Sequence, residues 1–213
     1  MSSYNIAKIQ KKLKKEMDDT RYTHTLGVMY TAAALAMCHE ADLERSTVAG
    51  LLHDCAKCIP NAQKLSLCEQ YKLPVSPIEQ KAPHLLHAKL GACIAHDKFH
   101  IRDSEILSAI RCHTTGKPDM TLLEKIIFVA DYIEPGRSKA PNLKEIRRMA
   151  FSDLDYAVYL TLRDTLSFLK QEKAALDNQT VVAYNYYRDL TEKKCVLHEE
   201  SLCDAQLVFA EKE

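Results

Sequence analysis

The stretch 121-TLLEKIIFVADYIEP-135 predicts one buried helix together with its start and its end. Thr121 and Glu124 have the spacing of a capping box, in which the two side chains bond reciprocally to backbone N–H groups of the first turn. Pro135 ends the helix after Glu134, because proline lacks an N–H and clashes with the preceding turn. Between these limits apolar residues recur at helical spacing, which is typical of a core helix.

One aspartate lies in the apolar stripe of this helix. Leu123, Ile127 and Asp131 are spaced i, i+4 and i+8, and therefore share one helix face. An ionised carboxylate on a buried face is costly unless it is paired with a cation or binds a metal ion. Asp131 is therefore a candidate functional residue.

Helical periodicity extends over most of the chain, and only five glycines occur in 213 residues. Long stretches with a 3.6-residue repeat and little β-branched alternation predict an all-α fold. Residues 71–83 contain three prolines and are expected to form an irregular connection between helices. A first helix is expected to carry the apolar stripe Ile6, Ile9, Leu13 and Met17, and a second helix is expected to start near Thr23. A third is expected at 47–57, between a Ser46 cap and Pro60. Further helices are expected at 85–96, at 105–113 after an Asp103 or Ser104 cap, at about 152–176 and around 181–190.

Composition fits a single domain and disfavours several classes of function. The 29 basic and 29 acidic residues give no net charge, so neither nucleic acid nor an anionic membrane is an expected partner. The sequence has no apolar signal segment at its N-terminus and no apolar run of about 18 residues that could span a bilayer. We therefore expect a cytoplasmic protein with reduced thiols, in which Cys38, Cys93 and Cys112 are small buried apolar residues. The expected domain is 1–190, followed by a tail of unknown role at 191–213.

The pair His53-Asp54 lies in 49-AGLLHDCAK-57, near the predicted end of its helix. Further histidines and an aspartate lie on predicted helices before and after this pair. Imidazole nitrogens together with carboxylate oxygens suit iron, manganese, cobalt or zinc, and such an ion can lower the pKa of bound water to near neutrality. In chain order the candidate ligands are His24, His53, Asp54, His87, His113 and Asp131.

A single His-Asp pair is weak support, because nine histidines and 14 aspartates in 213 residues make roughly 0.6 such pairs by chance. The chain has a second pair, His96-Asp97, but beyond the adjacent His100 only His113 and the distant His198 follow it. We therefore favour the first pair as ligands and place the second at an exposed helix end. The histidines expected to be solvated, or a secondary contact in the case of His84, are His39, His84, His100 and His198.

Cys55 and Cys58 form a CxxC pair beside the first His-Asp pair. A structural zinc site would need a second such pair, and a thioredoxin-like site would need a βαβ pattern; the sequence has neither. Packing is the favoured role for both thiols, with sensitivity of the neighbouring site to oxidation as a possible consequence.

Five segments form a pattern over roughly residues 4–190: 21-RYTHTLGV-28, 49-AGLLHDCAK-57, 84-HLLHAKLGA-92, 110-IRCHTTGKPDMTLLEKIIFVADYIEPGR-137 and 182-VAYNYY-187. In this order and spacing they resemble the symmetrical bis(5′-nucleosyl)-tetraphosphatases of the HD superfamily, the YqeK family. The order of His, His-Asp and Asp is shared by HD-type phosphohydrolases in general. The combination of HTTG with DYIEPGR is far more specific for this branch.

The resemblance implies an HD-domain helical bundle that hydrolyses diadenosine tetraphosphate symmetrically to two ADP with a metal-activated water. It implies one or two iron ions, with manganese or cobalt as alternatives; the metal ligands are then His24, His53, Asp54 and Asp131. The catalytic residues that it implies are His87, His113 and Lys57, the two histidines either building a second metal site or contacting phosphates. The substrate-binding residues that it implies are Arg21, Asp54, Lys57, His87, His113, Asp131, Arg137, Thr180, Tyr184 and Asn185.

Two other functions stay open from the sequence. One is a different HD-type nucleotide phosphohydrolase, a phosphomonoesterase or a triphosphatase; the other is a nucleotide-binding sensor without turnover. The expected partners are a dinucleoside polyphosphate and ADP, and a homodimer is compatible with the sequence. Product analysis separates the enzymatic alternatives.

Overall fold

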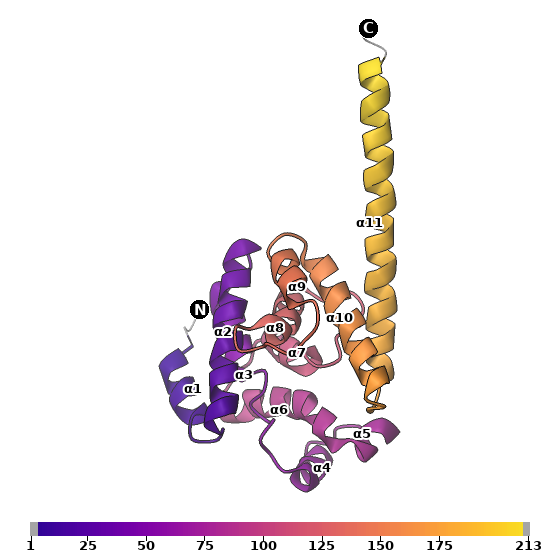
Figure 1. Cartoon of the computed structure of the whole chain (residues 1–213). Helices are drawn as coiled ribbons and strands as arrows, with labels where there is room; N and C mark the ends of the chain where they lie inside the picture. Colours follow the sequence, from indigo (N-terminus) through magenta and orange to yellow (C-terminus); the bar gives the residue numbers. More distant parts are fainter. Residues whose placement is uncertain (1–3, 211–213) are drawn as a thin grey trace.

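The structure is a computed structural model that describes the backbone of residues 4–210 and the side chains of residues 4–194. Within residues 4–210 all regular structure is helical, which confirms the predicted all-α fold (Figure 1). The helices are α1 (Ile6–Leu13), α2 (Asp19–Cys38), α3 (Leu43–Leu52), α4 (Asn61–Gln70), α5 (Pro77–Lys81), the 3₁₀ helix η1 (Pro83–Leu86), α6 (His87–Phe99), α7 (Ser104–Cys112), α8 (Leu122–Ile133), α9 (Leu143–Ala150), α10 (Leu154–Gln171) and α11 (Asn178–Ala210).

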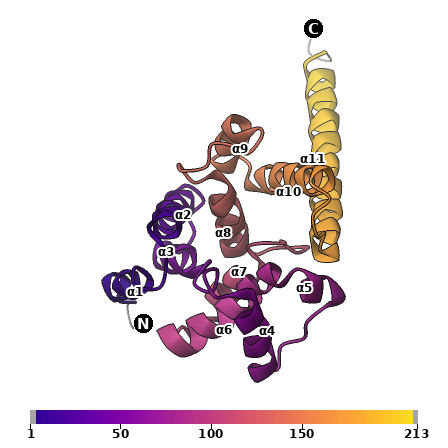
Figure 2. The same ribbon diagram turned by 60° about the horizontal axis from the view of Figure 1, so that its bottom comes forward.

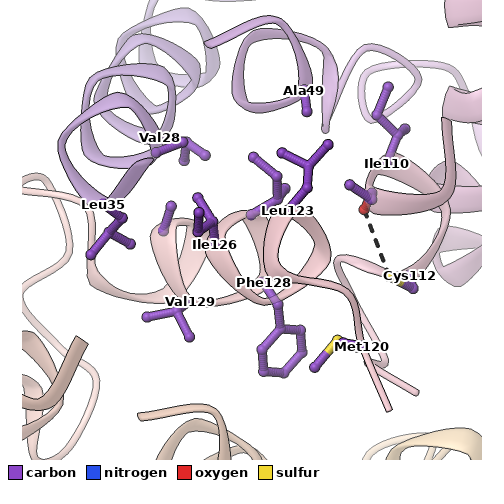
Figure 3. Packing of buried hydrophobic residues seen from close by; sticks show 14 of the residues in the cluster. Val28, Leu35, Ala49, Ile110, Cys112, Met120, Leu123, Ile126, Phe128 and Val129 are labelled. Atoms are coloured by element: carbon purple, nitrogen blue, oxygen red, sulfur yellow. Dashed lines mark hydrogen bonds between the residues drawn. The ribbon is translucent and has the colours of Figure 1, made fainter. Parts of the chain in front are cut away.

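Helix α8 lies at the centre of the molecule and packs against α2, α3, α7, α9 and α10 (Figure 2). Its predicted capping box is present: Glu124 N donates to Thr121 Oγ1 over 3.3 Å, and Thr121 N donates to Glu124 Oε2 over 2.8 Å. The helix ends at Ile133, one residue before the predicted limit, and Glu134 is its C-cap. Figure 3 shows Leu123 and Ile126 of α8 packed among apolar side chains of α2, α3 and α7. This core fixes the position of the last turn of α8, which carries the predicted functional aspartate.

Four other helices begin at aspartate caps, whose side chains accept N–H bonds from the first turn. The cap residues are Asp18 for α2, Asp42 for α3, Asp103 for α7 and Asp153 for α10. The Asp103 cap confirms the prediction, whereas the predicted Ser46 cap is wrong. Asp42 Oδ1 accepts from Arg45 N over 2.8 Å, so α3 starts earlier and Ser46 is fully buried inside it. Helix α2 likewise starts before the predicted Thr23, because Asp18 caps it.

Helices α4, α5 and α9 are absent from the prediction. The predicted helix 47–57 ends at Leu52, residues 53–58 form a turn, and Pro60 is the cap residue of α4. The connection predicted to be irregular contains α5, which has its own capping box, and η1 begins at its last residue. Short helices of this kind are marginal on their own and form because tertiary contacts stabilise them, so periodicity gives little signal.

Helix α11 continues beyond residue 190, so the predicted boundary does not coincide with a helix end. Its first half packs on α10, and polar contacts hold it to the bundle. Met120 N donates to Tyr187 Oη over 3.0 Å, and Lys194 Nζ bonds to Asp155 Oδ2 over 2.9 Å. Its second half extends away from the other helices (Figures 1 and 2). The side chain of His198, predicted to be solvated, lies outside the described residues.

Among residues 4–210, no helix combines the length and the apolar character needed to cross a bilayer. Six cysteines have described side chains, and all six are free thiols. Cys112 is buried as predicted and Cys93 is half-buried. Cys38 is exposed, against the prediction, because it lies at the end of α2, where its thiol donates to Phe151 O over 3.3 Å.

Candidate metal centre

The six candidate ligands from the sequence lie together in one cluster. They come from α2, the turn after α3, the first residue of α6, the turn after α7 and the last turn of α8. Neighbouring histidine rings lie edge to face, with centroids 5.1 to 5.4 Å apart. The residues are His24, His53, Asp54, His87, His113 and Asp131.

Three of the histidines are anchored through Nδ1 to a backbone carbonyl three residues earlier. The Nδ1···O distances are 2.7 Å for His53, 2.6 Å for His87 and 2.8 Å for His113. An N–H at Nδ1 is needed to bond to a carbonyl, so the neutral ring leaves the lone pair of Nε2 available. The carbonyls of Gly50 and Ile110 lie in the last turns of α3 and α7, where no helical N–H follows. The helix ends therefore orient the histidine rings.

One half of the cluster gathers around Asp131. His24 Nε2 lies 3.1 Å from Asp131 Oδ1, and His53 Nε2 lies 3.9 Å from the same oxygen. Asp54 Oδ2 is 3.6 Å from His53 Nε2 and 4.0 Å from His24 Nε2. Ligand atoms of His24, His53 and Asp131 all lie within 4.8 Å of one another, so a single ion can reach all three.

The other half of the cluster gathers around the second oxygen of Asp54. Asp54 Oδ1 lies 3.2 Å from His87 Nε2 and 3.4 Å from His113 Nε2. Ligand atoms of His53, Asp54 and His113 also lie within 4.8 Å of one another. His53 therefore belongs to both groups of potential ligands, and Asp54 lies near histidines of both.

The hydrogen bonding of the cluster fits a metal ion. Buried side-chain atoms without a hydrogen-bond partner in residues 4–194 include His24 Nε2, His53 Nε2 and Asp54 Oδ1. Unpaired polar atoms are rare in protein interiors, and three of them converge here. A set of imidazole nitrogens and carboxylate oxygens suits borderline divalent ions. The residues can therefore hold such an ion.

Burial controls the protonation of the cluster. It lowers the pKa of His53 to about 4, although the nearby carboxylates of Asp54 and Asp131 oppose the shift. It lowers the pKa of His87 to about 4 in the same way. Burial raises the pKa of Asp54, but the nearby rings of His53, His113 and His87 outweigh this effect and hold the pKa well below its usual range. Neutral imidazoles beside ionised carboxylates are the forms that bind metal.

Three cations predicted to bind phosphate line the cluster. Arg21 Nη1 donates to Asp54 Oδ2 over 2.7 Å, and Arg137 Nη2 donates to Asp131 Oδ1 over 2.8 Å. Lys57 Nζ lies 3.1 Å from His87 Nε2. The side chain of Arg21 is 30% exposed, that of Arg137 43% and that of Lys57 34%. An anion in solvent can therefore reach all three.

The predicted nucleotide segment lies on α11, farther from the cluster. Thr180 is buried, Asn185 is exposed and Tyr184 stacks on Tyr159 with centroids 5.8 Å apart. None of the contacts described for residues 4–194 joins these side chains to the six candidate ligands. The segment adjoins the turn after α7, because a Cβ added to Gly116 would lie 3.4 Å from Ala183 Cβ.

Comparison with known proteins decides the family. The HD domain family matches residues 21–136. A relative from Bacillus subtilis (strain 168), named "Bis(5'-nucleosyl)-tetraphosphatase, symmetrical", is 38% identical over 82% of this chain and 92% of its own length. A relative of the same name from Halalkalibacterium halodurans is 39% identical over 85% of this chain and 96% of its own length. The chain belongs to the HD-domain family of symmetrical bis(5′-nucleosyl)-tetraphosphatases.

A solved structure supports the same assignment. The crystal structure of a predicted HD superfamily hydrolase involved in NAD metabolism from Clostridium acetobutylicum has a TM-score of 0.84 and 37% identity. The match covers 88% of this chain and 99% of that chain. The family resemblance expected from the five sequence segments is confirmed, as is the HD-type helical bundle.

Two residues of this tetraphosphatase-family cluster were not predicted. Glu134 is buried, and its Oε1 lies 3.1 Å from His24 Nδ1. Thr114 Oγ1 lies 3.2 Å from Nε2 of both His87 and His113. Thr114 lies in the HTTG motif and Glu134 in the DYIEPGR motif, and membership of these motifs was the sequence feature that could have pointed to them. Their distant partners could not be deduced from spacing.

The remaining histidines lie outside the cluster. His96 Nδ1 bonds to Asp97 Oδ1 over 2.6 Å near the end of α6, with both side chains largely exposed, as predicted for this pair. His84 and His100 are both exposed, as predicted for residues outside the ligand set. The prediction of a solvated His39 is wrong, because its Nε2 bonds to Ala150 O over 2.6 Å and the residue is half-buried.

The CxxC pair is divided between the interior and the surface. Cys55 is buried and its thiol donates to Gly91 O over 3.4 Å, whereas Cys58 is exposed. Burial also raises the pKa of the Cys55 thiol, which suppresses the reactive thiolate. These observations agree with a packing role for Cys55.

Proposed function

We propose that the protein is a metal-dependent symmetrical bis(5′-nucleosyl)-tetraphosphatase that cleaves diadenosine tetraphosphate into two ADP. The observation that carries this proposal is the buried His/Asp cluster with unpaired ligand atoms in a chain of this family. This cluster supplies the imidazole and carboxylate ligands that the proposed chemistry needs.

The first ion would be held by His24, His53, Asp54 and Asp131, and we propose iron, with manganese or cobalt as alternatives. When bound, such an ion acts as a Lewis acid that lowers the pKa of water and polarises a phosphoryl oxygen. A cytoplasmic location is part of the proposal, and the free thiols of the described residues agree with it.

His87 and His113 are better suited to a second ion than to proton donation. With Nδ1 bonded to a carbonyl, a neutral ring offers Nε2 only as a lone-pair donor. The pKa of His87, lowered to about 4, keeps that ring neutral at neutral pH. Lys57 Nζ, which can donate to His87 Nε2, agrees with this tautomer. We therefore favour a second ion over a general acid.

The cations around the cluster would position the polyphosphate. Arg21, Arg137 and Lys57 each already contact a member of the cluster and keep a solvent-exposed part. Charge-assisted bonds from them would neutralise non-bridging oxygens, while water attacks an inner phosphorus and the bridging P–O bond breaks to release two ADP. We assign Thr180, Tyr184 and Asn185 to the nucleoside side of the substrate.

The test is product analysis with purified protein and diadenosine tetraphosphate, with added iron, manganese or cobalt and with a chelator. We expect two ADP for each substrate consumed, and no turnover after chelation. AMP together with ATP, or free phosphate, would instead indicate another phosphohydrolase. ADP binding without turnover in the metal-loaded protein would indicate a sensor.

A further inference from the structure

The four cluster histidines differ in how their second ring nitrogen is held. His53 and His113 directly follow a helix, and His87 follows η1, so each can bond Nδ1–H to a free backbone carbonyl. His24 lies inside α2, where the carbonyls of the preceding turn already accept the N–H bonds of the helix. His24 therefore needs a partner from another part of the chain.

That partner is the carboxylate of Glu134. Glu134 Oε1 lies 3.1 Å from His24 Nδ1, whereas the opposite nitrogen, Nε2, lies 3.1 Å from Asp131. Glu134 is 4% exposed, and its other oxygen accepts from Gly136 N over 2.6 Å. Among the four histidines, His24 alone thus has an anionic partner on the side away from the cluster.

The surrounding residues leave room for this carboxylate. A Cβ added to Gly27, in the helical turn that follows His24, would lie 2.5 Å from Glu134 Oε2. Glycine is unfavourable inside a helix. Its presence in α2 is explained by the space that the Glu134 carboxylate occupies beside it. Arg147 donates to the carbonyls of Ile133 and Glu134 over 2.9 and 3.0 Å, and thereby holds the segment that carries Glu134.

We propose that Glu134 is a positioning residue that fixes the Nδ1–H tautomer of His24 and strengthens metal binding through Nε2. A carboxylate on the far N–H orients a metal-binding imidazole and raises its basicity. Gly27 serves this role indirectly, because only a residue without a side chain lets Glu134 approach.

The inference rests on the proposed function only in requiring that the cluster bind a metal ion. It does not depend on which substrate the protein cleaves. Metal affinity is measured on the metal-free protein without nucleotide. A failure to cleave diadenosine tetraphosphate would therefore leave this inference standing, and an unchanged metal affinity would remove it without affecting the proposed activity.

The direct test compares Glu134→Gln with the wild type in titrations of metal-free protein with Co²⁺, followed by the absorption of the bound ion. Glutamine keeps the size and can still accept from His24, but it lacks the charge. We expect Co²⁺ affinity to fall about 10- to 100-fold. The matched control is Glu145→Gln, a carboxylate exposed on α9, which should bind Co²⁺ as the wild type does.

Gly27→Ala provides a second variant that leaves Glu134 in place. Alanine favours a helix interior over glycine, so a helix effect alone would leave metal binding unchanged and raise the unfolding temperature of the metal-free protein. Displacement of Glu134 by the new Cβ would instead weaken Co²⁺ binding by about 10-fold or more. The inference is overturned if both variants bind Co²⁺ within about twofold of the wild type, or if they lose only the stability of the metal-free fold.

Discussion

Asp54 has its two carboxylate oxygens directed at different histidines. Oδ2 faces His53 and His24, whereas Oδ1 faces His87 and His113. One residue thus belongs to both halves of the cluster, while Asp131 contacts only the half formed by His24 and His53. The two aspartates therefore carry separable contributions to the site.

Asp131→Asn should reduce turnover of diadenosine tetraphosphate at least about 100-fold, because an amide is a weaker ligand than a carboxylate and metal binding is weakened. The check is steady-state kinetics together with metal analysis of the purified variant. Asp97→Asn, in the exposed His-Asp pair, is the control and should keep wild-type turnover. Near-wild-type activity of Asp131→Asn with metal bound would remove Asp131 from the site.

At this scale, the sequence predicted which residues form the cluster but not how they are supported. Each candidate ligand lies in a short sequence motif, so the order His, His-Asp and Asp can be recognised from the sequence alone. The bond between His24 and Glu134 joins residues separated by 110 positions. Nothing in local spacing encodes such a contact, and it depends on how α2 and α8 pack.

Helix α8 links the core to the turn that carries His113. Glu124 is buried at its start, and the carboxylate bonds to Thr121 N and to Ser108. It also pairs with Lys117 over 2.8 Å, just after that turn. Burial raises the pKa of Glu124, but these bonds, led by Lys117, outweigh it and lower the pKa overall.

Glu124→Gln should destabilise the protein at pH 7 by about 1–3 kcal/mol, because the charge-assisted bonds are lost while the capping geometry is kept. A lowered pKa means that the carboxylate stabilises the fold above its unfolded pKa and loses this effect as pH falls. The difference between variant and wild type should therefore shrink below a pH of about 4.5. Urea unfolding over a pH series measures it, and a difference that is independent of pH would exclude the charge as its cause.

Capping signals predicted some helix limits well and others poorly. The reciprocal pair Thr121 and Glu124 is specific and was found in the structure. The prediction of Ser46 was wrong because Asp42, four positions earlier, caps α3 instead. Cap propensities of serine and aspartate are similar, so the choice depends on which start buries the apolar face of the helix.

The proposed metal ligands come from segments that are distant in the chain, so a bound ion would cross-link much of the molecule. We expect Mn²⁺ at 100 times its Kd to raise the free energy of unfolding by about 2.7 kcal/mol, and a chelator to reverse the gain. Urea unfolding with and without Mn²⁺ measures this effect. Asp131→Asn should show a smaller gain at the same Mn²⁺ concentration, and an equal gain would place the stabilising ion elsewhere.

The second half of α11 extends away from the bundle (Figure 1). The match with the Clostridium structure covers 99% of that chain but 88% of this one. The contacts of Tyr187 and Lys194 hold the first half of the helix. A chain that ends after Lys194 should therefore keep its thermal unfolding midpoint and its hydrolytic activity. Loss of either in the truncated protein would assign a structural or functional role to residues 195–213.

The most direct test of the account is anomalous diffraction from crystals of the protein grown with manganese. The account predicts a strong manganese peak within coordinating reach of His24 Nε2, His53 Nε2 and the carboxylates of Asp54 and Asp131. A peak only at other residues, or full occupancy of manganese in solution with no peak at this cluster, would contradict it.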